Sequence, residues 1–150
     1  MTDTRMTTAT PWHLWVVGVL SLLWNGFGAY DFVMTTTQGE AYMRSAGFDQ
    51  AMIDYYNAMP AWMYVPWTLG VWGAVIGSIL LLIRNRLAVW AFALSLLGAV
   101  VSLIYGQFIN PPPALPAGLE MMSYMPWVIT AVAAFLAWYA WVMAKKGVLR

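Results

Sequence analysis

Polar side chains are scarce in this chain, and two of them stand close together in residues 22–37, LLWNGFGAYDFVMTTT. The amide of Asn25 can exchange hydrogen bonds with a neutral solute, and the carboxylate of Asp31 can hold a cation or a proton. The indoles of Trp24 and Trp72, which lie far from the predicted span ends, could line a pocket. The candidate ligand site is therefore Asn25, Trp24, Trp72 and Asp31. The alternative is structural, with Asn25 bonding a neighbouring helix and the two tryptophans serving as packing.

The remaining side chains form no recognisable catalytic or metal-binding pattern. His13 is the only histidine and there is no cysteine, so a set of imidazole and thiolate ligands is not available. The acidic residues lack the spacing of a metal-binding loop, and the glycines of 70–77, GVWGAVIG, lie inside an apolar stretch rather than in a phosphate-binding loop. We expect no enzyme, no cofactor and no nucleic-acid partner.

The composition predicts that lipid surrounds most of the chain. Of the 150 residues, 62% are hydrophobic and 9% are charged, whereas a soluble domain carries about a quarter charged residues. Four stretches, 6–30, 55–83, 87–119 and 121–144, contain no Asp, Glu, Lys or Arg. Each exceeds the roughly 20 residues that cross a bilayer as a helix. We predict one all-α domain over residues 1–150, a membrane four-helix bundle of up-down-up-down topology, with spans at about 12–34, 61–83, 87–109 and 122–144.

The distribution of charge predicts the orientation of these spans. An even number of spans places both chain ends and the turn between spans two and three on one side. That side has six positive charges against one negative, a net of +5, from Arg5, Arg84, Arg86, Lys145, Lys146, Arg150 and Asp3. The other side has one positive charge against five negative, a net of −4, from Arg44, Asp31, Glu40, Asp49, Asp54 and Glu120. Because short basic loops stay in the cytoplasm, both termini are predicted to be cytoplasmic.

The depth of the polar groups bears on ion coupling. We expect Asp31 at the outer edge of the first span and Asn25 six residues deeper, about 9 Å along the helix axis. His13 is expected at the opposite edge. No ionisable side chain is then predicted at the middle of a span, whereas ion-coupled carriers normally place a carboxylate, histidine or lysine there.

The two external connections differ in character. Residues 47–60 predict a short interfacial helix in the first one, with Asp49 as its cap and Phe48 as a hydrophobic staple. Its apolar residues, three or four apart, favour a position flat on the outer membrane surface, although a lid over a substrate would have a similar sequence. The second connection contains NPPPALPAGLE, which predicts an irregular, stiff cap because proline removes backbone donors.

An internal repeat is predicted from two similar span starts. Tyr64-Val-Pro-Trp67 and Tyr124-Met-Pro-Trp127 are 60 residues apart, which suggests two helical hairpins arranged in parallel. The alternative is that Pro-Trp simply suits a helix start at an aromatic belt. Small residues at helical spacing predict close helix packing, which counts against an open channel. They are Gly70, Gly73, Gly77, Ser95, Gly98, Ser102, Ala133 and Ala137.

The chain resembles a family of small bacterial four-span membrane proteins, often labelled as sugar transporters or as proteins of unknown role. The resemblance rests on WNxxGxxDF (residues 24–32), MTTT, MPAW, VWGAVIGSILLL and the final GVLR. It implies a multi-pass protein of the bacterial inner membrane, and it covers nearly the whole chain.

Two functions are consistent with these patterns. In the first, a non-enzymatic membrane protein acts by association, as an accessory or envelope-related factor with a homo-oligomer or a membrane partner. In the second, an oligomer carries a small neutral solute passively, with Asn25, Trp24 and Trp72 lining the site.

Overall fold

The computed structural model describes residues 8–150, and every regular element in this part of the chain is helical. Four long apolar helices confirm the predicted all-α membrane bundle and fit a multi-pass membrane protein. They are α1 (Trp12–Gln38), α4 (Tyr64–Leu82) after the 3-10 turn Ala61–Met63, α5 (Leu87–Ile104) continued by the π-helical turn Tyr105–Ile109, and α6 (Met125–Lys145) after the 3-10 turn Glu120–Tyr124. Asp3 and Arg5, which entered the charge count, lie outside the described residues.

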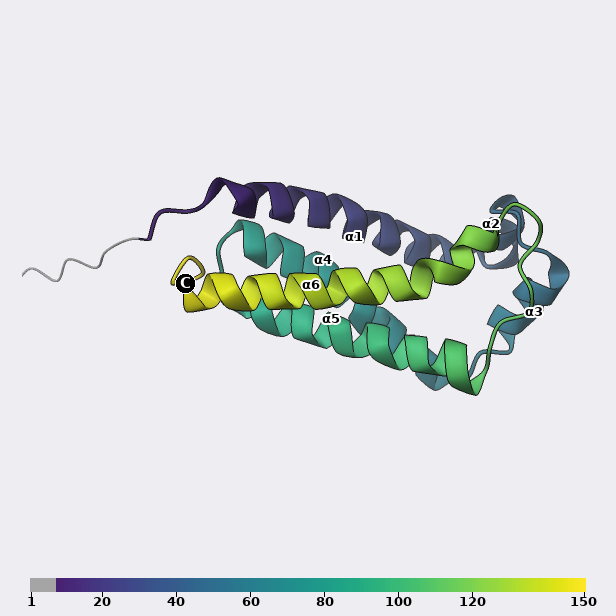
Figure 1. Ribbon diagram of the computed structural model, residues 1–150. Helices are drawn as coiled ribbons and strands as arrows, with labels where there is room; N and C mark the ends of the chain where they lie inside the picture. The colour runs from purple at the N-terminus through teal and green to yellow at the C-terminus, as the bar shows by residue number, and fades with distance from the viewer. Residues whose placement is uncertain (1–7) are drawn as a thin grey trace, which may run out of the picture.

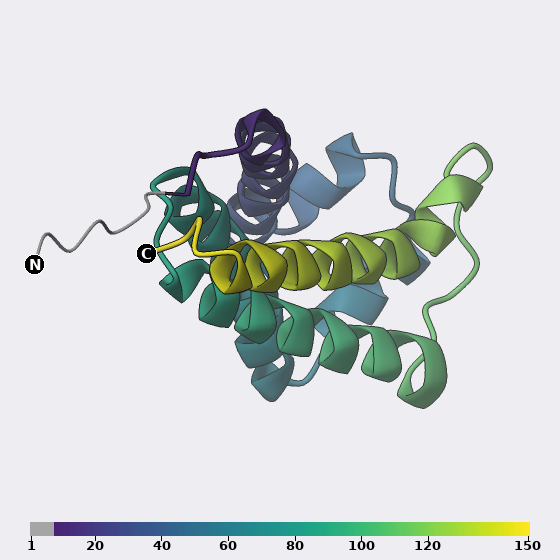
Figure 2. The same ribbon diagram turned by 60° about the vertical axis from the view of Figure 1, so that its left-hand side comes forward.

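The long helices pack as successive neighbours, α1 on α4, α4 on α5 and α5 on α6 (Figure 1 and Figure 2). Gly18, early in α1, faces Leu82 at the end of α4, and Phe32, late in α1, contacts Trp67 at the start of α4. These two helices are therefore antiparallel. The up-down-up-down topology across a bilayer stays a prediction.

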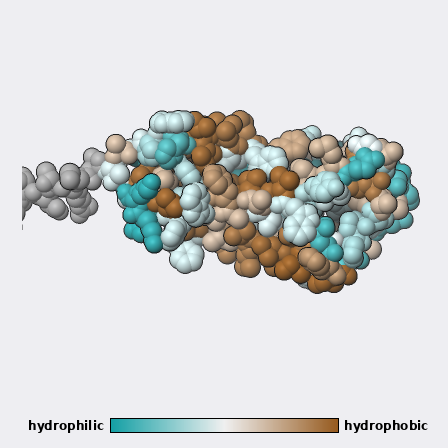
Figure 3. All heavy atoms as spheres, viewed as in Figure 1, coloured by the Kyte–Doolittle hydropathy of each residue, from teal (hydrophilic) through white to brown (hydrophobic). Residues whose placement is uncertain are grey.

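On the face that Figure 3 shows, hydrophobic residues cover much of the middle of the bundle and hydrophilic ones lie at its two ends. We name the ends by their charges. The basic end carries Arg84, Arg86, Lys145, Lys146 and Arg150, and the acidic end carries Asp31, Glu40, Asp49, Asp54 and Glu120. This separation is what a membrane-spanning bundle requires, because lipid covers the apolar middle and water covers the ends.

Helix α1 continues past the predicted span end at residue 34 to Gln38. The hydroxyl of Thr36 donates to the carbonyl of Phe32 at 2.8 Å and that of Thr37 to the carbonyl of Val33 at 2.6 Å, which satisfies the threonines within the helix. The helix ends at Gly39, whose φ of 54° suits glycine. Threonine is a weak helix former, but three in succession do not stop a helix that has no other breaker.

Two short helices close the acidic end, α2 (Glu40–Ser45) and α3 (Gln50–Asn57) (Figure 1). The sequence predicted α3, and Asp49 caps it as expected by accepting a 3.0 Å hydrogen bond from the amide of Met52. Met52 and Ile53 are 3% and 0% exposed, so α3 turns its apolar side into the bundle end rather than toward lipid. Phe48 stacks on the ring of Tyr56 at a centroid distance of 6.0 Å. Helix α2 was not predicted.

Small residues let α4 and α5 approach most closely. A Cβ added at Gly73 would lie 3.0 Å from the carbonyl oxygen of Ala91, and one added at Gly98 would lie 2.6 Å from the backbone nitrogen of Gly70. Ser95 adds a 2.7 Å hydrogen bond from its hydroxyl to the carbonyl of Gly70. This contact depends on backbone proximity, as expected between helices in lipid.

The other predicted packing residues take different places. Gly77 faces the Phe92 ring, where an added Cβ would lie 2.7 Å from a ring carbon. Ala133 is 8% exposed, Ala137 packs against the main core cluster, and Ser102 is half-buried. The two YxPW segments share a local structure, since each marks the passage from a 3-10 turn into a long helix.

Candidate functional site

Asn25 lies at the centre of α1. The helix has 27 residues, so 13 precede Asn25 (12–24) and 13 follow it (26–38). Its amide nitrogen donates to the hydroxyl of Ser78 at 2.9 Å and to the carbonyl of Ala74 at 3.3 Å, both in α4. Asp31 lies six residues further along the same helix, as expected, and the helix continues beyond it to Gln38. The amide of Asn25 therefore joins α1 to α4 by hydrogen bonds, which is the structural role that the sequence left open beside ligand binding.

Among residues 8–150, neither tryptophan of the candidate site shares a hydrogen bond with Asn25. Trp72 packs edge-on against Phe32, with ring centroids 6.2 Å apart, and is 37% exposed. Trp24 is 39% exposed and has no ring partner among the described aromatic pairs. The hydrogen bonds of the Asn25 amide therefore go to Ala74 and Ser78 and to neither indole.

Asp31 anchors α2 to α1. Its carboxylate accepts a 2.8 Å hydrogen bond from the hydroxyl of Tyr42, whose ring lies edge-on against Tyr30 at 6.5 Å. The hydrogen bond to Asp31, with a smaller contribution from burial, raises the pKa of Tyr42 to about 12. Asp31 thus holds the structure of the acidic end.

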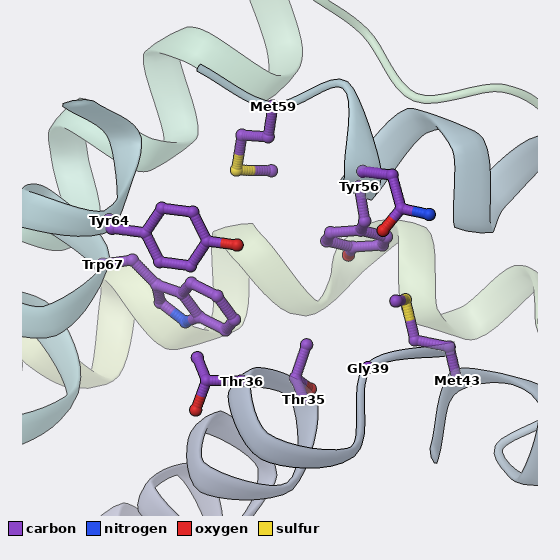
Figure 4. Close-up of a pocket in the computed structure, with 9 residues that line it drawn as sticks. Thr35, Thr36, Gly39, Met43, Tyr56, Met59, Tyr64 and Trp67 are labelled. Carbon is purple, nitrogen blue, oxygen red and sulfur yellow. The ribbon is translucent and has the colours of Figure 1, made fainter. Parts of the chain in front are cut away.

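A pocket of about 380 Å³ opens at the acidic end, between the end of α1, the short helices α2 and α3 and the start of α4 (Figure 4). We call it the outer pocket. Figure 4 shows Tyr64 and Trp67 on one side, Tyr56 on the opposite side and the two threonines below them. Its lining is Thr35, Thr36, Gly39, Met43, Tyr56, Asn57, Met59, Tyr64 and Trp67. None of these residues is charged, and none belongs to the predicted ligand site.

The outer pocket offers neutral hydrogen-bonding groups beside aromatic rings. Within the described part of the chain, no partner reaches the hydroxyls of Thr35 and Tyr64 or the indole nitrogen of Trp67, so these groups can donate to a ligand. Burial raises the pKa of Tyr56 to about 12, so its hydroxyl stays protonated at neutral pH. Phe32 packs edge-on against Trp67 at 4.7 Å and fixes that indole.

Sequence reasoning missed this pocket because its residues come from four elements. The predicted first span ends at residue 34, before the threonines, and the YVPW motif predicts a helix start rather than a site. The run of hydroxyls at 35–37 opposite an aromatic helix start was the available signal. The antiparallel packing of α1 on α4 brings the threonines to the start of α4, and the turn at Gly39 leads into α2 and α3, which complete the lining.

His13 has a structural partner at the basic end. Its Nδ1 atom shares a 2.5 Å hydrogen bond with the hydroxyl of Tyr139, which joins α1 to α6. Within residues 8–150, no group of three His, Cys, Asp or Glu side chains gathers where it could hold a metal ion.

Comparisons with models of protein families, with curated proteins and with solved structures find no match. The likeness to small bacterial four-span proteins stays a prediction from sequence motifs. The outer pocket is therefore the feature on which a functional proposal rests.

Proposed function

We propose that this small membrane protein binds a small neutral solute in the outer pocket and carries it across the membrane passively, as an oligomer. The observation that carries the proposal is the lining, in which aromatic rings and hydroxyl groups occur without a charged side chain. A charged ligand would need an opposite charge or many donors to replace its water. A neutral ligand with hydroxyl groups needs only the donors and acceptors that this lining supplies.

The size of the pocket supports a small ligand. Its volume of about 380 Å³ is near the low end of the roughly 300–1,000 Å³ of ligand pockets. The rings of Tyr64 and Trp67 lie side by side, with centroids 5.8 Å apart, and give the apolar face of a small ring or chain a surface to contact.

The long helices support a passive mechanism. The centre of α1 carries the neutral amide of Asn25, and the charged residues of the described chain lie at the basic or the acidic end. Proton- or ion-coupled carriers use an ionisable group near mid-membrane. A carrier built from this chain alone would move its solute only down the concentration gradient of that solute.

The repeat supplies a matched pair of variants for the test. Trp67 lines the pocket, whereas Trp127, its counterpart in α6, is 49% exposed and does not. Radiolabelled neutral polyols, amino acids and sugar phosphates would be tested for binding to purified protein and for uptake into proteoliposomes. We expect neutral solutes alone to bind, with Trp67→Ala weakening affinity about tenfold and Trp127→Ala leaving it unchanged. Equal effects of the two variants, or no binding of any neutral solute, would contradict the proposal.

Association with another membrane protein or a second copy is the second candidate function. It is favoured by exposed apolar side chains on α1 and α6. Leu23 and Phe27 on α1 are 67% and 69% exposed, and Trp138 on α6 is 56% exposed. Because the chain has no cysteine, Leu23→Cys provides a single crosslinking site. A product of twice the protomer mass in native membranes supports a homo-oligomer, and recovery of monomer alone counts against it.

A further inference from the structure

The basic end gathers cations from two separate segments of the chain. Arg84 and Arg86 belong to the turn between α4 and α5, and Lys145, Lys146 and Arg150 end or follow α6. The acidic residues of the described chain all belong to the opposite end. The ion pair found among the described residues, between side chains of α2, is also there.

The backbone holds these two segments together. The amide of Arg150 donates to the carbonyl of Arg84 at 2.7 Å, and the amide of Arg86 donates to the carbonyl of Arg150 at 2.9 Å. Val148 and Leu149, just before, are 3% and 2% exposed and belong to the main core cluster. The positions of Arg86 and Arg150 are thus fixed side by side by main-chain bonds and by apolar burial.

Aromatic residues place this cationic surface at the level of lipid headgroups. Lys145 lies over the ring of Trp141, with its Nζ 4.0 Å from the ring centroid. Trp12 and Trp138 are 76% and 56% exposed near the same end. Tryptophans of this kind form belts at the membrane interface, so the cations beyond them meet headgroup phosphates. Arg84 is oriented by a 2.6 Å bond from its Nη1 to the hydroxyl of Thr10.

We propose that the basic end is a binding site for the phosphate of an anionic phospholipid, with Arg86 and Arg150 as its principal contacts. A guanidinium presents several donors in a fixed fork that matches phosphate oxygens. Basic residues between the ends of membrane helices favour such headgroups over zwitterionic ones. The docked segment Val148–Arg150 makes the site specific to this fold, because it brings the second arginine to the turn.

The test uses the full chain in mixed micelles with equal phosphatidylglycerol and phosphatidylcholine. Native mass spectrometry counts the lipids that stay bound. We expect one or two phosphatidylglycerol molecules to be retained in several-fold excess over phosphatidylcholine. Arg86→Gln and Arg150→Gln are expected to lower that excess, each by up to about fivefold. Arg44→Gln, which removes the same charge at the acidic end, is the matched control and is expected to change nothing.

The two hydrogen bonds that hold Arg150 to Arg84 and Arg86 are made by main-chain atoms, so the glutamine variants are expected to keep the segment docked. Circular dichroism checks that the variants stay helical. Equal retention of the two lipids by the unchanged protein would overturn the proposal, as would an unchanged excess in the double variant. Glycerol 3-phosphate at the concentration of the lipid is expected not to displace it. Displacement by this soluble phosphate would show that the site takes a free phosphate ester instead of a lipid.

Discussion

The amide of Asn25 donates a 2.9 Å hydrogen bond to the hydroxyl of Ser78, and that hydroxyl donates a 2.8 Å hydrogen bond to the carbonyl of Ala74. This series of bonds joins the centre of α1 to α4 in an otherwise apolar part of the bundle. It satisfies two polar side chains that would be costly to leave alone in lipid. Helix α1 therefore has a defined register against its main neighbour.

Loss of this bond is expected to weaken the bundle. Asn25→Ala should lower the free energy of unfolding in micelles by about 0.6–2 kcal/mol, the usual size of a polar contact between membrane helices. Ser78→Ala should cost a similar amount, and the double variant less than the sum, because both remove one interaction. Ser21→Ala is the control, since the hydroxyl of Ser21 bonds only within its own helix. Additive losses would show that the two side chains act separately.

Close approach of α4 and α5 depends on Gly98. Gly98→Ala is expected to cost about 1–3 kcal/mol of unfolding free energy, because the added methyl group would meet the backbone of Gly70. Gly28→Ala is the matched control, since nothing lies within 4 Å of its added Cβ. Chemical denaturation in micelles measures both. Equal stability of the two variants would mean that the helices can separate without cost.

The bond between Asp31 and Tyr42 predicts a titration at high pH. The folded-state pKa of Tyr42 is raised to about 12 from 10, so its contribution to stability is complete below pH 10 and is lost as the pH rises through about 12. Absorbance at 295 nm should show this late ionisation, and Tyr42→Phe should lower its amplitude to the part that comes from Tyr56, whose pKa is also raised to about 12. Asp31→Asn should return the pKa of Tyr42 toward 10. If Tyr42 still ionised near pH 12 in Asp31→Asn, the hydrogen bond to Asp31 would not be the cause of the raised pKa.

The segment after α6 is expected to contribute to folding stability. Leu149 is 2% exposed in the core cluster that includes Leu14 and Leu81. Leu149→Ala should lower the unfolding free energy by about 2–5 kcal/mol, the usual cost of a buried leucine truncation. Lys146→Ala, at an exposed position one turn earlier, should have little effect. Thermal denaturation in detergent compares the two, and similar melting temperatures would show that the segment is not docked in solution.

The predicted orientation can be tested with single cysteines in this cysteine-free chain. Asn85→Cys and Lys146→Cys, both at the basic end, should be protected from an impermeant thiol reagent added outside intact cells. Gln50→Cys and Ala117→Cys, at the acidic end, should react. Labelling of the first pair and protection of the second would reverse the orientation.

The sequence by itself determined the fold class and the general position of its elements. Apolar stretches longer than a bilayer crossing leave helices as the structure that satisfies the backbone, and the glycine positions on α4 and α5 indicated where helices would meet closely. The cap of α3 was also readable, because Asp49 satisfies amides only a few residues away. All of these features depend on local chemistry.

Only the tertiary structure decided which polar groups share a site. Sequence neighbours such as Trp24 and Asn25 point in different directions on a helix, because successive residues are about 100° apart. Residues that line the outer pocket, such as Thr35 and Trp67, meet because α1 packs antiparallel on α4, and α2 and α3 complete the pocket. The meeting of Arg86 with Arg150 likewise depends on where α6 ends against the α4–α5 turn. Such long-range contacts follow from how whole helices pack, and no local pattern encodes them.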